Sequence, residues 1–163
     1  MPQLRELLDS QVQLSSNFCN LLEAEKKALI EMNISSLVDL ARKKERELVR
    51  LQRLDENIQI IIQRIISLAG GKISGPVKLH DLLSFLNAGD KATVSDYHKK
   101  LSSLRTDILT ANHINQHFAS DTLGYLNDAV SFICNGISSD TLYNPKSREQ
   151  RGKSYPALVS REV

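Results

Sequence analysis

The chain has 163 residues, a formal net charge of +2, no tryptophan and only 5% aromatic residues. This length suits one domain, and the composition favours long helices over strands. The body of the chain is nearly neutral, which argues against a nucleic-acid-binding domain, because such a domain would carry a basic face on its folded elements.

The sequence also lacks the features of a membrane-inserted or secreted chain. It has no basic-then-apolar leader, and its most apolar segment, Ile58 to Ala69, is interrupted by Gln59, Gln63 and Arg64. That segment is too polar to cross a bilayer. We expect a cytoplasmic protein with no direct membrane insertion.

The first two predicted helices form a hairpin. Leucines on one broad face predict a first helix over Pro2–Met32. Asn33 can take the left-handed conformation that ends a helix, and Ser36 with Asp39 is typical of the cap of the next one. Because the connection is so short, the two helices should lie antiparallel.

The second helix is expected to run to about Ala69. Lys44 interrupts its apolar seam and should keep its amine in water while its stem lies along the seam. The basic run from Arg42 to Arg46 has two interpretations, a patch for RNA or anionic membrane and a solvated helix face. Glu45 and Glu47 within and beside the run favour the solvated face.

A short third element and a long last helix follow. The glycine pair at 70–71 should end the second helix, and Ser74 to Pro76 should start a short helix over Val77–Ala88 that caps one end of the hairpin. Thr93 with Asp96 predicts the start of the last helix.

The last helix carries the most informative pattern. A seam with a period near 3.5 runs from Val94 to Gly136, as in a coiled coil. At 1.5 Å per residue this helix is longer than the other two by roughly 15–20 Å, so its C-terminal end should project beyond them. A second apolar row widens the pattern over that end: Leu123, Leu126, Val130, Ile133 and Ile137.

Two polar residues, Asn115 and Thr122, lie on this otherwise apolar seam. One interpretation is that they are core residues that set the register between helices. The other is that they face a bound partner. The sequence leaves both open.

We divide the chain into a helical domain, 1–137, and a flexible basic tail, 138–163. From Tyr143 onward there are five basic residues and two acidic ones. The tail has too few apolar residues to hold itself in place. Leu142 and Tyr143 at its start are either a docking element or an anchor back onto the helix.

Catalytic and metal-binding patterns are weak. His113, His117 and Asp121 have helical spacing, but they lie away from the seam, and we interpret them as solvent-facing. Cys19 and Cys134 are interpreted as reduced packing residues. We find no phosphate loop or convergent carboxylates, and therefore expect no enzyme, cofactor or metal.

The arrangement resembles the FlgN family of flagellar export chaperones. The resemblance rests on the leucine-rich first helix, the turn at 33–36, the charged stretch 44–51, Asn115 on a long last helix, and Thr141-Leu142-Tyr143 before a basic tail. It covers the whole chain in architecture. The insert 70–91 departs from the shorter family members.

The resemblance implies a fold and a function. The fold is all-α, an antiparallel bundle of three long helices and one short one. The function is to bind the C-terminal helices of hook-associated proteins, prevent their premature assembly and deliver them to the export gate, a membrane protein. Leu142 and Tyr143 would dock on that gate. The client would lie on the last helix, at Asn115, Phe118, Thr122, Leu123, Leu126, Val130, Phe132, Ile133 and Ile137.

Two other classes remain open at this point. One is a coiled-coil scaffold or homodimer in which residues 123–137 cover one another. The other is a histidine phosphotransfer bundle, for which His98, followed by Lys99 and Lys100, is the best candidate. His98 lacks the small neighbouring residue that such a histidine needs.

Overall fold

The computed structural model describes residues 1–71, 75 and 77–140. Its elements are, in order, α1 (Pro2–Ile30), α2 (Ile34–Leu68), the 3-10 helix η1 (Asp81–Phe85) and α3 (Ala88–Asp140). The expected all-α fold is confirmed, with three long helices and one short one. The chain divides into two units, Met1–Thr122 and Leu123–Val163, and each is described by itself.

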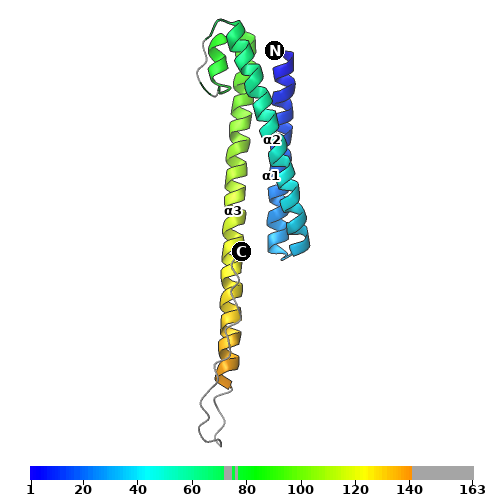
Figure 1. Ribbon diagram of the computed structural model, residues 1–163, viewed down its shortest axis with the longest axis vertical. Helices are drawn as coiled ribbons and strands as arrows, with labels where there is room; N and C mark the ends of the chain where they lie inside the picture. Colours follow the sequence, from blue (N-terminus) through cyan, green and yellow to red (C-terminus); the bar gives the residue numbers. More distant parts are fainter. Residues whose placement is uncertain (72–74, 76, 141–163) are drawn as a thin grey trace, which may run out of the picture. The chain divides into compact units, whose positions relative to one another are not determined.

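Helices α1 and α2 lie side by side as the expected antiparallel hairpin (Figure 1). The turn between them differs from the predicted one in two details. Met32, at φ 52°, takes the left-handed position, and Asn33, at φ −86°, is the cap of α2. The Asn33 side-chain oxygen accepts from the Ser36 amide at 3.0 Å, so Asn33 satisfies one of the first free amides of α2. The left-handed position therefore falls one residue earlier than expected.

Helix α2 ends at the predicted glycine pair. Gly70 has φ 77°, and the amide of Gly71 donates to the Ile66 carbonyl at 2.9 Å. This is the Schellman arrangement, in which glycine takes the left-handed position without a steric penalty. The short element that follows is smaller than predicted. Only Asp81–Phe85 is helical, as a 3-10 turn, instead of an α-helix over 77–88.

Gly71 lies so close to its neighbours that a side chain there should destabilise the fold. A Cβ would lie 2.5 Å from Cγ2 of Ile66 and 2.8 Å from Cε1 of Phe85. Ile66 is buried and has little room to move. We expect Gly71→Ala to lower the free energy of unfolding by about 1–2 kcal/mol through overpacking, as measured by urea unfolding. Gly89→Ala is the control, since its nearest atom is 3.8 Å away. Equal stability of the two variants would contradict the prediction.

The start of α3 also differs from the prediction. Asn87 accepts from the Asp90 amide at 2.8 Å and donates to the Asp90 carboxylate at 2.9 Å, a reciprocal cap. Thr93 therefore lies inside the helix, where its hydroxyl donates to the Gly89 carbonyl. The prediction that Thr93 and Asp96 form the N-terminal capping box of this helix is wrong, because Asn87 caps the helix six residues earlier.

The main core of the unit Met1–Thr122 joins all four elements. It lies at the end of the hairpin where α2 passes into η1. Its members are large aliphatic residues that are almost fully enclosed: Leu4, Leu8, Ile58, Ile62, Ile66, Val77, Leu82 and Val94. Val77 and Leu82 come from the segment around η1, so this short element covers the end of the hairpin as expected.

Tyr97 of α3 forms a hydrogen bond with α1 that changes the pKa of its phenol. Its hydroxyl donates to the Asp9 carboxylate at 2.5 Å, and this bond, followed by burial and the Asp9 charge, raises the pKa of Tyr97. Because the folded state favours the protonated phenol, its contribution to stability is complete below the ordinary tyrosine pKa of about 10 and is lost as the pH rises through the raised pKa.

We therefore expect Asp9→Asn to lower the pKa of Tyr97. The measurement is an ultraviolet titration of each protein, with the matching Tyr97→Phe chain subtracted so that only Tyr97 contributes. A Tyr97 phenol that titrates at the same pH in wild type and in the Asp9→Asn variant would show that the hydrogen bond does not control it.

Candidate binding surface

The last part of α3 carries a very broad apolar surface, which we call the α3 face. At 100° per residue, the apolar positions from Leu123 to Ile133 cover an arc of about 180–200° around the helix. A helix that packs on one neighbour needs an apolar stripe of only ~100°. This width is therefore more than one packed helix requires.

Side chains of the α3 face are strongly exposed. Phe132 is 81% exposed and Leu126, the least exposed of them, is still 50% exposed. Isolated exposed apolar residues are ordinary on protein surfaces, whereas a contiguous patch indicates an interaction site. The members of the α3 face are Leu123, Tyr125, Leu126, Val130, Phe132 and Ile133.

The opposite side of this helical stretch is polar and lacks positive charge. Asn127, Ser131 and Asn135 occupy it, Asp128 lies at its edge one turn before Phe132, and all four are exposed. From residue 106 to residue 140 the sequence contains no lysine or arginine. The α3 face is thus bordered by neutral and acidic side chains, and any partner helix should carry neutral or basic flanks.

Asn115 is buried at 4% exposure, on the side of α3 that contacts α1. Its amide nitrogen donates to the Leu22 carbonyl at 2.8 Å and to the Glu25 carboxylate at 3.0 Å. Glu25 also accepts from Lys44 of α2. These bonds within one chain favour the register interpretation of Asn115 over contact with a partner.

The expectation that Lys44 keeps its amine in water is wrong. Its side chain is only 18% exposed, and its ammonium group pairs with Glu25 instead of reaching into water. No local pattern in the sequence singles out Glu25. The one available signal was the presence of two polar residues, Lys44 and Asn115, on apolar seams, since such residues require a partner when buried.

The remaining predicted site residues differ in exposure, and some of them are not described by the structure. Phe118 is 41% exposed and Thr122 is half-buried. Ile137 belongs to α3, but its side chain lies outside the described residues, as do Leu142 and Tyr143 altogether. The structure therefore brings together the part of the predicted client site between Leu123 and Ile133.

His113 and His117 are exposed, and His117 Nδ1 lies 2.9 Å from Asp121 Oδ2. Among the described residues, no group of three or more His, Cys, Asp or Glu side chains is placed to hold a metal ion. Burial, followed by the Asp107 charge, raises the pKa of the Cys19 thiol, which disfavours its reactive thiolate form.

No helix within the described ranges is both long enough and apolar enough to span a bilayer. Fold and surface together define an all-α helical-bundle protein with an exposed apolar helix face. The family model of FlgN protein matches residues 1–151. The chain therefore belongs to the FlgN family, a family of flagellar export chaperones, and the resemblance seen in the sequence is confirmed. No curated protein and no solved structure matches it significantly.

Proposed function

We propose that the chain acts in the cytoplasm and holds the C-terminal helical segment of a hook-associated protein on the α3 face. It would prevent premature assembly of that client and deliver it to the membrane export gate. Family membership supports the chaperone role in general. The exposure of the six side chains of the α3 face, from Leu123 to Ile133, is the observation that carries the assignment of the site.

The chemistry of such a client fits this surface. A segment that forms helices in a filament is amphipathic and has no partner before assembly. An amphipathic helix can bury its apolar side against another helix, and the anchors then recur at helical spacing. Leu123, Leu126, Val130 and Ile133 have this spacing along α3.

Truncation tests whether this part of α3 is needed. We expect a chain that ends after Ser120 to keep the folded hairpin and to lose the client, since all members of the α3 face are removed. Far-UV circular dichroism checks the fold, and pull-down with a hook-associated protein checks binding. Client binding that survives the truncation would place the site elsewhere.

A variant of Tyr143 tests docking on the export gate separately from client binding. If Leu142 and Tyr143 contact the export gate, Tyr143→Ala should weaken binding to the cytoplasmic domain of the gate protein by about tenfold or more, as aromatic anchors often do. Its affinity for the client should not change. Titration against each partner gives both values, and Tyr155→Ala in the same tail is the matched control. Equal gate affinity of wild type and Tyr143→Ala would remove the proposed docking role.

A homodimer is the second candidate, and the same exposed surface favours it. In such a dimer, residues 123–137 of each copy would cover the same residues of the other copy. Sedimentation with an added client peptide distinguishes the two: a chaperone forms a one-to-one complex, whereas a scaffold remains a dimer.

A further inference from the structure

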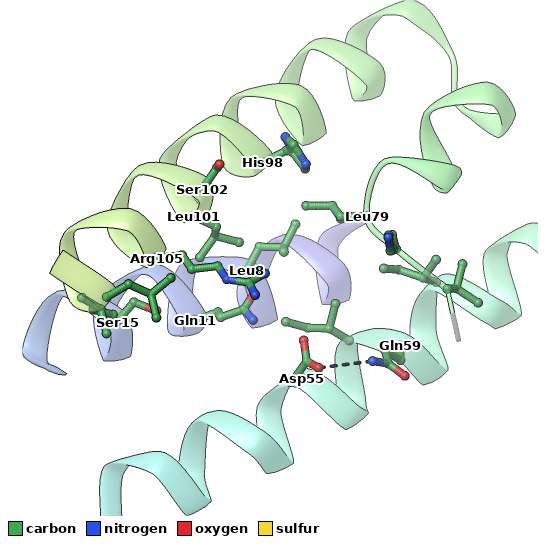
Figure 2. A pocket seen from close by; sticks show the side chains of 16 residues that line it. Leu8, Gln11, Ser15, Asp55, Gln59, Leu79, His98, Leu101, Ser102 and Arg105 are labelled. Carbon is green, nitrogen blue, oxygen red and sulfur yellow. Dashed lines mark hydrogen bonds between the residues drawn. The ribbon is translucent and has the colours of Figure 1, made fainter. Parts of the chain in front are cut away.

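An open groove runs through the unit Met1–Thr122, between α2 and α3 with α1 as its floor (Figure 2). Its volume is about 530 Å³. Leu8 of α1, Leu79 from the segment before η1 and Leu101 of α3 line it. Leu79 and Leu101 are only half-buried, and Leu109 at one end is 60% exposed. The groove therefore leaves apolar surface open to solvent.

This groove is elongated along the helices. On α3 its lining extends from His98 to Leu109, about 16 Å at 1.5 Å per residue, and on α2 from Asp55 to Ile62, about 10 Å. A length of 10–16 Å corresponds to roughly two to three helical turns. The groove thus has the dimensions and direction to receive one further helix.

Positive charge borders the groove on the side of α3. Arg105 extends from α3 over it (Figure 2), and Lys78, from the segment before η1, also lines it. Neither Arg105 nor Lys78 forms an ion pair with any residue that the structure describes. The acidic residue of the lining, Asp55 on α2, accepts from Gln59 at 3.2 Å. A helix in the groove should therefore place carboxylates toward α3.

His98, whose imidazole can donate a hydrogen bond to a carboxylate, lies seven residues before Arg105 on α3, which is about 10.5 Å along the helix. Acidic residues at positions i and i+7 of an incoming helix would match this distance. Asp121 and Asp128 of α3 itself have this spacing and border the α3 face. Both are exposed, and Asp121 also contacts His117.

The charge of the chain's own tail does not complement the groove. From Tyr143 onward it carries five basic residues and two acidic ones, so it would meet Arg105 and Lys78 with like charge. The stretch from 106 to 140 contains no lysine or arginine. Charge complementarity therefore favours the end of α3, supplied by a second copy of the chain.

We propose that the groove of one copy receives the α3 face of a second copy, with Asp121 and Asp128 toward the side of the groove that His98 and Arg105 line. This contact shields the α3 face until a client displaces it. The shielding role rests on the proposed client site, whereas the self-association does not.

Charge reversal tests the contact in the full chain. The groove variant carries Lys78→Glu and Arg105→Glu, and the helix variant carries Asp121→Lys and Asp128→Lys. In sedimentation velocity over a concentration series, wild type should self-associate, and each variant alone should do so at least about tenfold more weakly, because like charges then meet. A mixture of the two variants should regain association, because each offers the charge that the other now needs.

The control is Arg64→Glu with Lys91→Glu, two exposed cations outside the groove, which should leave association unchanged. Recovery in the mixture shows that both variants are folded. A wild type that is monomeric throughout, variants that associate normally alone, or a mixture that stays monomeric would each overturn the proposal.

Client binding distinguishes this proposal from the proposed function. A C-terminal helical peptide of a hook-associated protein should dissociate the wild-type assembly and should bind the groove variant more tightly, since self-association no longer competes. A peptide that binds without dissociating the assembly would overturn the shielding role. Recovery in the mixture together with no peptide binding would reject the client site and leave the self-association standing.

Discussion

Replacing Leu126 and Ile133 by serine should weaken client binding by about 100-fold or more. A fully buried aliphatic side chain contributes ~1.5–3 kcal/mol, and every 1.4 kcal/mol corresponds to a factor of ten in affinity. Both residues are at least 50% exposed without a client, so the free protein should lose little stability. Isothermal titration with a C-terminal helical peptide of a hook-associated protein measures the effect.

The matched control lies on the other side of the same helix. Asn127→Ser with Ser131→Ala changes two exposed polar positions between the same turns and should leave the affinity unchanged. Circular dichroism should show equal helix content in both double variants. Similar affinities for the two would mean that the α3 face does not hold the client.

Removing the Glu25 carboxylate should lower the free energy of unfolding by about 2–3 kcal/mol. Glu25 accepts from Lys44 and from Asn115, and it is the contact point between α1, α2 and α3. In Glu25→Ala, a mostly buried ammonium group and a buried amide both lose a partner. Breaking a fully buried ion pair costs ~3–5 kcal/mol. We expect less here because the Lys44 side chain keeps 18% of its exposure and can move toward water.

Urea unfolding measures this loss, and Glu31→Ala provides the control. Glu31 pairs with Lys27 at 3.9 Å, but both side chains are more than half exposed. Such surface pairs contribute ~0–1 kcal/mol, so Glu31→Ala should be close to wild type. Glu25→Gln can still accept from Asn115 and should fall between the two. A loss in Glu25→Ala no larger than that in Glu31→Ala would show that the buried contact does not stabilise the bundle.

Seam periodicity was enough to predict the three long helices and the broad apolar end of the last one. Periodicity is a local property, because a helix repeats its faces every few residues whatever packs on it. The helix ends were predicted less well. Asn33 and Asn87 act as caps, whereas the sequence pattern favours Ser36 and Thr93 at these starts. Several nearby residues were suitable caps, and the path of the turn selected among them.

The roles of the buried polar residues could not be predicted in the same way. Asn115 and Thr122 had equivalent positions on the seam, yet Asn115 is enclosed and bonded to α1 while Thr122 is half-buried. Glu25, the partner of Asn115, is ninety residues away in the sequence. No local pattern relates two such residues, because their contact depends on how the helices are packed.

By itself, the sequence determined the all-α class, the hairpin, the family and the apolar width of α3, since each of these follows from local patterns or from whole-chain similarity. The tertiary structure alone decided which polar residues pair in the core and where the groove between α2 and α3 lies. Hydrogen bonds and grooves arise between elements distant in sequence. Their existence therefore depends on the spacing of packed helices and not on the periodicity of any one of them.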